Sequence, residues 1–175
     1  MLDTFERPIT YLRISVTDRC NFRCRYCMPE EGVKMRVHSD MCSFEELRDI
    51  AAAAVRCGIN KIRVTGGEPL VRRGIVDFCR MLSALEGLEE LCLTTNGSLL
   101  PALARPLREA GVDRLNISLD TLRPERFRYI TRLGSLEQTL EGIRAAEEAV
   151  FFSSLLHSLL QKVRSQQIVT TPITE

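Results

Sequence analysis

Four short runs in which apolar and polar residues alternate, each followed by a helical run, constrain the fold of this 175-residue chain more than any other feature. We predict strands over residues 11–17, 61–65, 90–95 and 114–119. Strands that alternate with helices favour a parallel sheet joined by right-handed crossovers. The sequence therefore predicts an α/β fold with four βα units.

Capping signals mark the helices expected between these strands. Ser43 is followed three residues later by Glu46, which is a capping box and predicts a helix over residues 43–57, ending at Gly58. Further helical runs are expected over residues 74–85, in a proline-interrupted stretch that ends at Gly111, and over residues 135–149. The segment after Pro124 is expected to form only a short turn.

The alternation gives the predicted sheet one polar face. The polar positions are Arg13, Ser15, Thr17, Lys61, Arg63, Thr65, Cys92, Thr94, Asn96, Asn116, Ser118 and Asp120. Parallel sheets usually bury both faces under helices, so a polar face indicates a curved barrel wall whose lumen holds a ligand. Arg13, Lys61 and Arg63 favour an anion such as a phosphate there. The alternative is an internal layer of polar side chains that satisfy one another's hydrogen bonds.

Three cysteines follow the first predicted strand with the spacing C-x3-C-x2-C. Cys20, Cys24 and Cys27 thus lie beyond the carboxyl end of that strand, where α/β proteins and barrels keep their active sites. Three thiolates leave a tetrahedral metal site open at one position, and an open position favours chemistry. A structural zinc closed by His38 is the alternative. The cysteines without such spacing are Cys42, Cys57, Cys79 and Cys92.

Charge and hydropathy narrow the classes of partner. The chain carries 24 basic and 23 acidic side chains, which is not the basic excess of a protein that binds nucleic acid or an anionic membrane surface. No apolar stretch reaches the length needed to span a bilayer. We therefore expect a cytoplasmic protein, in which seven cysteines are thiols or metal ligands rather than disulfides.

The charge density changes near the C-terminus. Of the 47 charged side chains, only Lys162, Arg164 and Glu175 lie in the last 26 residues. Apolar residues in this region have helical spacing over residues 151–163 and then give way to a polar, β-branched end. We predict a core over residues 1–149 and a distinct tail over residues 150–175.

Four motifs make the chain recognisable. The sequence LRISVTDRCNFRCRYCMPEEG, followed by KIRVTGGEPLVR, LTTNG and LNISLDTL, resembles the radical S-adenosylmethionine (SAM) superfamily. Within that superfamily it is similar to the GTP 3',8-cyclases of molybdenum cofactor biosynthesis. The resemblance covers roughly residues 8–148 and implies a partial (βα)6 barrel, TIM-like, of which this chain holds about four units.

The resemblance also implies cofactors and residue roles. Cys20, Cys24 and Cys27 would hold a four-iron four-sulfur (4Fe-4S) cluster whose remaining iron binds SAM. An electron donor and this cluster would generate the 5'-deoxyadenosyl radical that abstracts hydrogen from C3' of GTP. The residues implied to contact SAM are Tyr26, Gly66, Gly67 and Ser118. Those implied to contact GTP are Arg13, Arg63 and Thr94, and the residues expected to shape the same lumen are Asn96, Gly97 and Asp120.

The chain departs from the family pattern after Ala149. Family members continue with two more strands and with three further cysteines that hold a second 4Fe-4S cluster, and these features have no counterpart here. The expectation is a chain that binds the first cluster and cleaves SAM without converting GTP. Loss of the last strands would leave the fourth strand as an open edge, at which a homodimer can form. The alternatives are another radical SAM enzyme and a non-catalytic metal-binding or interaction module.

Overall fold

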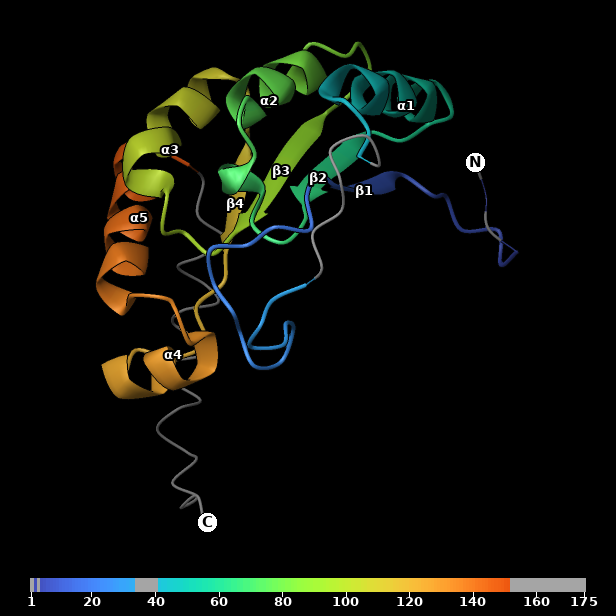
Figure 1. The fold of residues 1–175 in the computed structure, drawn as a ribbon. Helices are drawn as coiled ribbons and strands as arrows, with labels where there is room; N and C mark the ends of the chain where they lie inside the picture. The colour runs from blue at the N-terminus through green and yellow to red at the C-terminus, as the bar shows by residue number, and fades with distance from the viewer. Residues whose placement is uncertain (1, 3, 34–40, 152–175) are drawn as a thin grey trace.

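The computed structural model describes residues 2, 4–33 and 41–151, and its centre is a four-stranded parallel sheet (Figure 1). The strands are paired in chain order, β1-β2-β3-β4. Their bounds are β1 (Tyr11–Ser15), β2 (Lys61–Thr65), β3 (Glu90–Thr95) and β4 (Arg114–Ile117). This confirms the predicted α/β fold, a partial barrel wall with β1 and β4 at its two edges.

The helices lie on one side of the sheet. Their bounds are α1 (Phe44–Arg56), α2 (Ile75–Ser83), α3 (Leu100–Glu109), α4 (Pro124–Thr131) and α5 (Leu136–Glu148). In Figure 1, α1, α2, α3 and α5 form an arc over one face, whereas α4 lies below the sheet, near the carboxyl ends of the strands. None of the helices in the described part of the chain has the length and hydrophobicity to cross a membrane.

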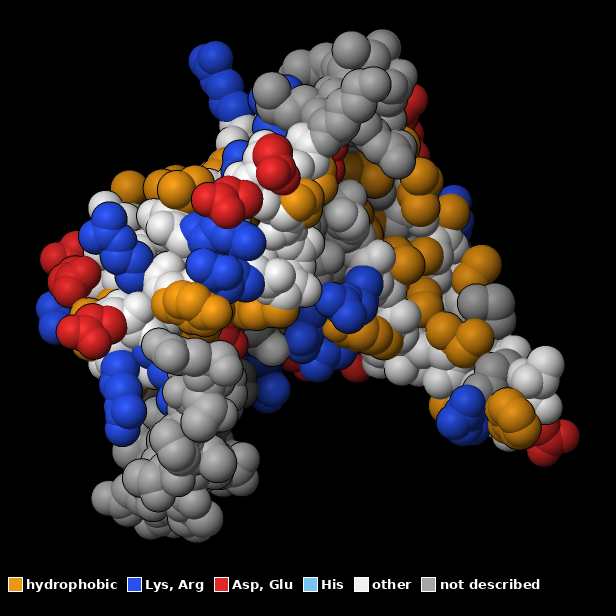
Figure 2. Space-filling view, turned by 60° about the horizontal axis from the view of Figure 1, so that its bottom comes forward, with side chains coloured by type: hydrophobic (Ala, Val, Ile, Leu, Met, Phe, Trp, Pro, Cys, Tyr) orange, Lys and Arg blue, Asp and Glu red, His pale blue; other side chains and the backbone are white. Residues whose placement is uncertain are grey.

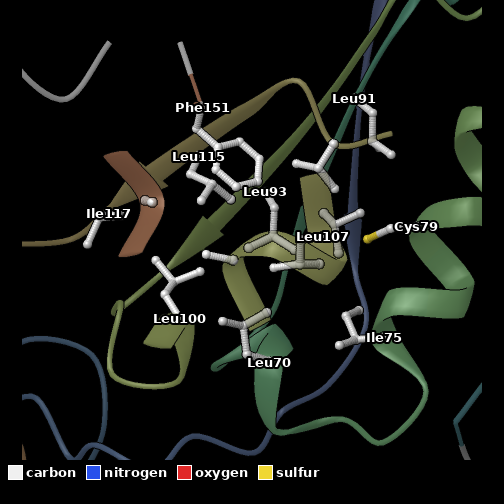
Figure 3. Close-up of a cluster of buried hydrophobic side chains, with 14 of the residues drawn as sticks. Leu70, Ile75, Cys79, Leu91, Leu93, Leu100, Leu107, Leu115, Ile117 and Phe151 are labelled. Atoms are coloured by element: carbon white, nitrogen blue, oxygen red, sulfur yellow. The ribbon is translucent and has the colours of Figure 1, made fainter. Parts of the chain in front are cut away.

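The face under the helices is apolar, as the alternation predicted. Ile62, Val64, Leu91 and Leu93 are fully or almost fully buried and share one hydrophobic core with residues of α2 and α3. Figure 3 shows Leu91 and Leu93 within this core. The opposite face carries the polar positions. Side chains at alternate strand positions therefore separate the core from the open side of the wall.

The predicted capping signals are present. The Ser43 hydroxyl accepts a hydrogen bond from the Glu46 N–H at 3.1 Å, and the Glu46 carboxylate accepts one from the Ser43 N–H at 2.7 Å. At the start of α5, the Ser135 hydroxyl accepts a hydrogen bond from the Gln138 N–H at 3.3 Å. Both helices thus begin where the sequence predicted, because each cap supplies partners for otherwise unpaired N–H groups.

Three elements differ from the prediction. Strands β1 and β4 are each two residues shorter at the carboxyl end than expected. The Val16 N–H still bonds to the Thr65 carbonyl at 2.9 Å, but the chain then leaves the ladder to begin the cysteine loop. The segment after Pro124 is not a short turn but the helix α4, since proline at the first helical position is compatible with a helix start.

The end of α5 contains a non-glycine residue in a left-handed conformation. Val150 has φ 56°, and its N–H bonds to the Glu147 carbonyl while the Phe151 N–H bonds to the Ala146 carbonyl. This is the Schellman arrangement, in which glycine is the usual residue at the left-handed position. Phe151 is buried within the core (Figure 3). The rest of the predicted tail, including the expected helix over residues 152–163, lies outside the described residues, as does His38.

Candidate active site

The three spaced cysteines lie on a loop that leaves β1 at the carboxyl edge of the sheet (Figure 1). Cys20 and Cys24 are half-buried, and Cys27 is exposed. The Cys27 N–H bonds to the Cys24 carbonyl at 3.0 Å, which makes a tight turn between these two residues. The Cys20 sulfur accepts a hydrogen bond from the Phe22 N–H at 3.3 Å. N–H groups that donate to a thiolate tune the reduction potential of an iron-sulfur cluster that the thiolate binds.

The thiols influence one another electrostatically. Burial is the main cause that raises the pKa of Cys20, and the charges of Glu68 and Cys27 add to it. Burial and the neighbouring Cys27 raise the pKa of Cys24 to about 11. Cys20 and Cys24 therefore keep their protons at neutral pH in the absence of a cation, and metal binding by these two thiols must release protons.

The donor set fits an iron-sulfur cluster by its chemistry. Thiolates are the ligands of 4Fe-4S clusters, and each binds a different iron, so three of them need to surround a common space and not a single ion. In residues 2, 4–33 and 41–151, no three His, Cys, Asp or Glu side chains are grouped closely enough to surround one metal ion. The three cysteines come from one loop, and the exposed Cys27 leaves its outer side accessible.

The two glycines after β2 pack against the start of the cysteine loop. A Cβ on Gly67 would lie 2.3 Å from the Arg19 carbonyl oxygen, and one on Gly66, at φ 153°, would lie 2.6 Å from the Thr17 carbonyl oxygen. The Gly67 N–H donates to that Thr17 carbonyl at 2.7 Å. The family resemblance implies that both glycines contact SAM. In the structure they first of all let two loops of the chain itself meet.

Glu68 is a site residue that sequence reasoning did not single out. It is 1% exposed, and its carboxylate accepts hydrogen bonds from the Leu70 N–H at 3.0 Å, the Thr95 hydroxyl at 2.7 Å and the Asn96 N–H at 2.7 Å. Burial raises the pKa of this carboxyl, although the three hydrogen bonds act against the shift. The sequence feature that could have pointed to Glu68 is its position, since it is a charged residue directly after two glycines at the end of a strand.

A polar network joins the end of β3 to the cysteine loop. Asn96 donates from Nδ2 to the Asn21 side-chain oxygen at 2.8 Å, and Asn21 donates to the Ser98 hydroxyl at 2.9 Å. The Ser98 hydroxyl donates back to the Asn96 side-chain oxygen at 2.7 Å. Asn96 also forms a side-chain hydrogen bond with Cys20. The next residue, Gly97, donates its N–H to the Thr95 hydroxyl at 3.0 Å.

The structure brings Tyr26 together with Asp120. The Tyr26 hydroxyl donates to the Asp120 carboxylate at 3.0 Å, which links the cysteine loop to the segment after β4. Burial and the Asp120 charge raise the pKa of Tyr26. The ring is 66% exposed, so its face is open to a ligand. Ser118 is exposed at the end of β4, and its N–H bonds to the Thr95 carbonyl at 2.8 Å.

The residues expected to contact GTP lie on the open face of the sheet. Arg13 and Arg63 are directly opposite each other in the β1–β2 register. Thr94 lies on the same face of β3, opposite Asn116. The Nε atom of Arg63 is buried and has no hydrogen-bond partner among the described residues. A buried donor of this kind is costly unless a ligand satisfies it.

Fewer basic side chains are unpaired on the open face of the sheet than the sequence indicated. Lys61 lies 2.9 Å from the Glu90 carboxylate, and Arg114 lies 3.3 Å from it, so two basic residues share one acid at the amino end of the sheet. The hydrogen bond from Lys61 is the main cause that lowers the pKa of Glu90. Among the described residues, Arg13 and Arg63 are the basic strand residues of this face that form no ion pair with an acidic side chain. At its amino end this face thus resembles the satisfied polar layer of the alternative, while a ligand further along the face stays a prediction.

The predicted site residues lie on the side of the sheet that the helices do not cover. Figure 2 shows the face nearest the carboxyl edge, where Lys and Arg side chains lie in its middle beside hydrophobic patches. Exposed residues of the site include Arg13, Tyr26, Cys27 and Ser118. The assigned roles of the individual site residues stay predictions, but the fold gathers all of them at the carboxyl edge and open face of one sheet.

Sequence comparison identifies related proteins. The model of the radical SAM superfamily matches residues 14–165. The GTP 3',8-cyclase of Geobacter sulfurreducens is 61% identical over 151 residues, which are 86% of this chain and 46% of that protein. The GTP 3',8-cyclase of Peptoclostridium acidaminophilum is 58% identical over 160 residues, which are 91% of this chain and 49% of that protein. The chain thus spans about half the length of these curated relatives.

Solved structures show the same fold at low identity. SuiB from Streptococcus suis bound to its precursor peptide SuiA matches with a TM-score of 0.70 and 15% identity, over 89% of this chain and 36% of that one. HydG, a maturase of FeFe hydrogenase, matches with a TM-score of 0.66 and 17% identity, over 81% of this chain and 33% of that one. At such identities the likeness concerns the fold alone.

Proposed function

This chain belongs to the radical SAM superfamily, and from that membership we propose that it is the SAM-binding half of a GTP 3',8-cyclase of molybdenum cofactor biosynthesis. The observation that carries the proposal is the cysteine loop at the carboxyl edge of a parallel sheet, held there by the glycine pair and by the Glu68 N–H, which donates to the Arg19 carbonyl at 2.8 Å. The cofactor pair expected from the sequence, a 4Fe-4S cluster and SAM, is that of the superfamily.

In this proposal Cys20, Cys24 and Cys27 hold the cluster as thiolates. When bound, the cluster and SAM supply a 5'-deoxyadenosyl radical able to abstract hydrogen from C3' of GTP. Tyr26 would offer the open face of its ring to the adenine, while its hydroxyl stays bonded to Asp120. The other SAM contacts of the proposal are the backbone of Gly66 and Gly67 and the hydroxyl of Ser118.

The open face would hold the substrate. Arg13 and Arg63 form a basic pair across β1 and β2, and the unsatisfied Nε of Arg63 supports an anionic ligand such as a triphosphate. Thr94 would add a hydroxyl on the neighbouring strand. The chain spans about half of these relatives, and we propose that its residues 1–149 bind the cluster and cleave SAM. An electron donor, a cytoplasmic location and a homodimer complete the proposal.

Anaerobic iron-sulfur reconstitution tests the cluster. We expect an absorbing cluster and, with dithionite and SAM, release of 5'-deoxyadenosine; both should be lost in Cys20→Ala, Cys24→Ala and Cys27→Ala. Cys57→Ala is the matched control, because Cys57 is exposed at the end of α1 and outside the loop. A parent chain that holds stoichiometric zinc and no iron would contradict the proposal in favour of a metal-binding module.

Equilibrium binding of GTP tests the substrate. Arg63→Ala should weaken binding on the order of tenfold, because a charged donor to a phosphate contributes enough for such a change. Arg73→Ala, an exposed arginine beyond β2, is the control and should bind GTP like the parent. Cluster formation without GTP binding would instead favour another radical SAM enzyme.

A further inference from the structure

The cysteine loop is held along its length by the carboxyl end of α4. The Arg23 N–H bonds to the Thr131 carbonyl at 3.0 Å, and the Arg25 N–H bonds to the Ile130 carbonyl at 2.9 Å. Arg25 also donates from Nε to the Tyr129 carbonyl at 2.8 Å, and its guanidinium lies 4.1 Å from the centre of the Tyr129 ring. Two segments about a hundred residues apart thus pair side by side.

The side chain of Arg132 closes this contact. Its Nη1 donates to the Arg23 carbonyl at 2.8 Å and to the Met28 carbonyl at 3.1 Å. These carbonyls come directly before Cys24 and directly after Cys27. One nitrogen therefore joins the two ends of the segment that carries both cysteines. The Arg132 side chain is 19% exposed, so water competes little for these bonds.

The backbone at Arg132 is strained. Its φ of 60° and ψ of −54° are those of a rare γ-turn, and the Leu133 N–H bonds across it to the Thr131 carbonyl at 2.8 Å. Conformations of this kind cost free energy and persist only where the surroundings impose them. Glycine would adopt this backbone more easily than arginine. The side chain, and not the turn, therefore accounts for an arginine at this position.

We propose that Arg132 is a positioning residue, whose guanidinium holds the segment from Arg23 to Met28 in the shape that presents Cys24 and Cys27 to one space. Its purpose rests on the proposed function, since that shape serves to receive the cluster. An arginine suits this role because its donors are fixed in a rigid plane and stay charged at any physiological pH. Arg23 holds the neighbouring turn by donating to the carbonyls of Cys20 and Phe22.

The first test uses the cluster-free chain. Arg132→Gly removes the guanidinium and relieves the turn, so we expect its unfolding midpoint to equal or exceed that of the parent. The Arg23 and Arg25 amides should exchange hydrogen on the order of tenfold faster, as expected from lost charge-assisted hydrogen bonds. Alkylation of Cys24 should accelerate likewise. Arg132→Lys keeps one cationic donor, so its exchange and alkylation rates should lie between those of the parent and of Arg132→Gly.

The control variant is Arg128→Ala, which removes an exposed arginine from the same helix and should exchange like the parent. Unchanged exchange and alkylation in Arg132→Gly would overturn the proposal. So would faster exchange spread evenly over the sheet and α1, since that would indicate a general structural role. These measurements test the role of Arg132 even if the parent chain assembles no cluster. Failure of the parent to assemble a cluster would count against the proposed function and not against the role of Arg132.

A second readout follows the loaded protein. Reconstituted Arg132→Gly should lose iron to a chelator on the order of tenfold faster than the parent and Arg128→Ala, with an altered electron paramagnetic resonance signal of the reduced cluster. Iron loss at the parent rate, with an unchanged signal, would contradict a positioning role for Arg132.

Discussion

The carboxylate of Glu68 holds three donors from two neighbouring loops while it is almost completely buried. It fixes the end of β3 relative to the glycine pair after β2. Asn96 then extends the connection to Cys20 and Asn21. A single buried side chain thus joins the loop after β2 to the end of β3.

Replacement of Glu68 by alanine should be strongly destabilising. Glu68→Ala leaves the N–H groups of Leu70 and Asn96 and the Thr95 hydroxyl without their partner, and it opens a cavity. We expect the free energy of unfolding to fall by about 3 kcal/mol, measured by urea denaturation. The control Glu86→Ala removes an exposed carboxylate and should change stability by less than about 0.5 kcal/mol. Equal effects of the two variants would contradict the anchoring role.

The raised pKa of Glu68 predicts a pH dependence of stability. A group that binds its proton more tightly in the folded state contributes stability that is complete below its ordinary pKa of 4.5 and is lost as the pH rises through the raised value. Glu68→Gln cannot titrate. The unfolding free energy of the parent minus that of Glu68→Gln should therefore fall as the pH increases from 4.5, measured by urea denaturation across a pH series. A difference that rises would show that the hydrogen bonds outweigh burial.

Helix α5 ends in a motif whose residue does not suit its backbone. Val150 occupies the left-handed position of the Schellman arrangement, where a β-branched side chain is an outlier. It is 72% exposed and so gains little from packing.

Val150→Gly should stabilise the protein. Relief of the left-handed strain gains about 1–2 kcal/mol, and the more flexible unfolded chain offsets part of it. We expect a net gain of about 1 kcal/mol in unfolding free energy, measured by urea denaturation. Ala149→Gly is the matched control and should destabilise, because Ala149 has a right-handed backbone at φ −79°. A loss of stability in Val150→Gly would contradict the strain.

The whole molecule is a wall with one covered and one open face. Its core lies between the sheet and the arc of helices (Figures 1 and 3). The polar strand positions lie on the opposite face of the sheet. Phe151 belongs to this core although it follows α5, and the Arg108 guanidinium lies 6.0 Å from the centre of its ring. The packed core thus includes Phe151, which lies beyond the predicted end of the core at Ala149.

Phe151→Ala should show that this residue closes the core. Removal of a buried aromatic ring costs roughly 3 kcal/mol or more through lost burial and the cavity left behind. We expect a corresponding fall in the unfolding midpoint, measured by thermal denaturation. Phe5→Ala removes a ring that is 76% exposed and should leave the midpoint nearly unchanged. Equal midpoints for both variants would mean that the core ends before Phe151.

The sequence by itself determined the strands, their polar and apolar faces, the caps of α1 and α5 and the cysteine spacing. These features depend on local alternation and on contacts three residues apart, which a single sequence displays directly. Four sequence motifs also indicated the radical SAM superfamily. Only the tertiary structure decided that α4 is a helix that holds the cysteine loop, that Glu68 bonds to the end of β3, and that Glu90 takes up the charge of Lys61. The physical reason is distance along the chain: the Arg132–Arg23 bond joins residues 109 apart, and no local pattern encodes which groups such folding brings together.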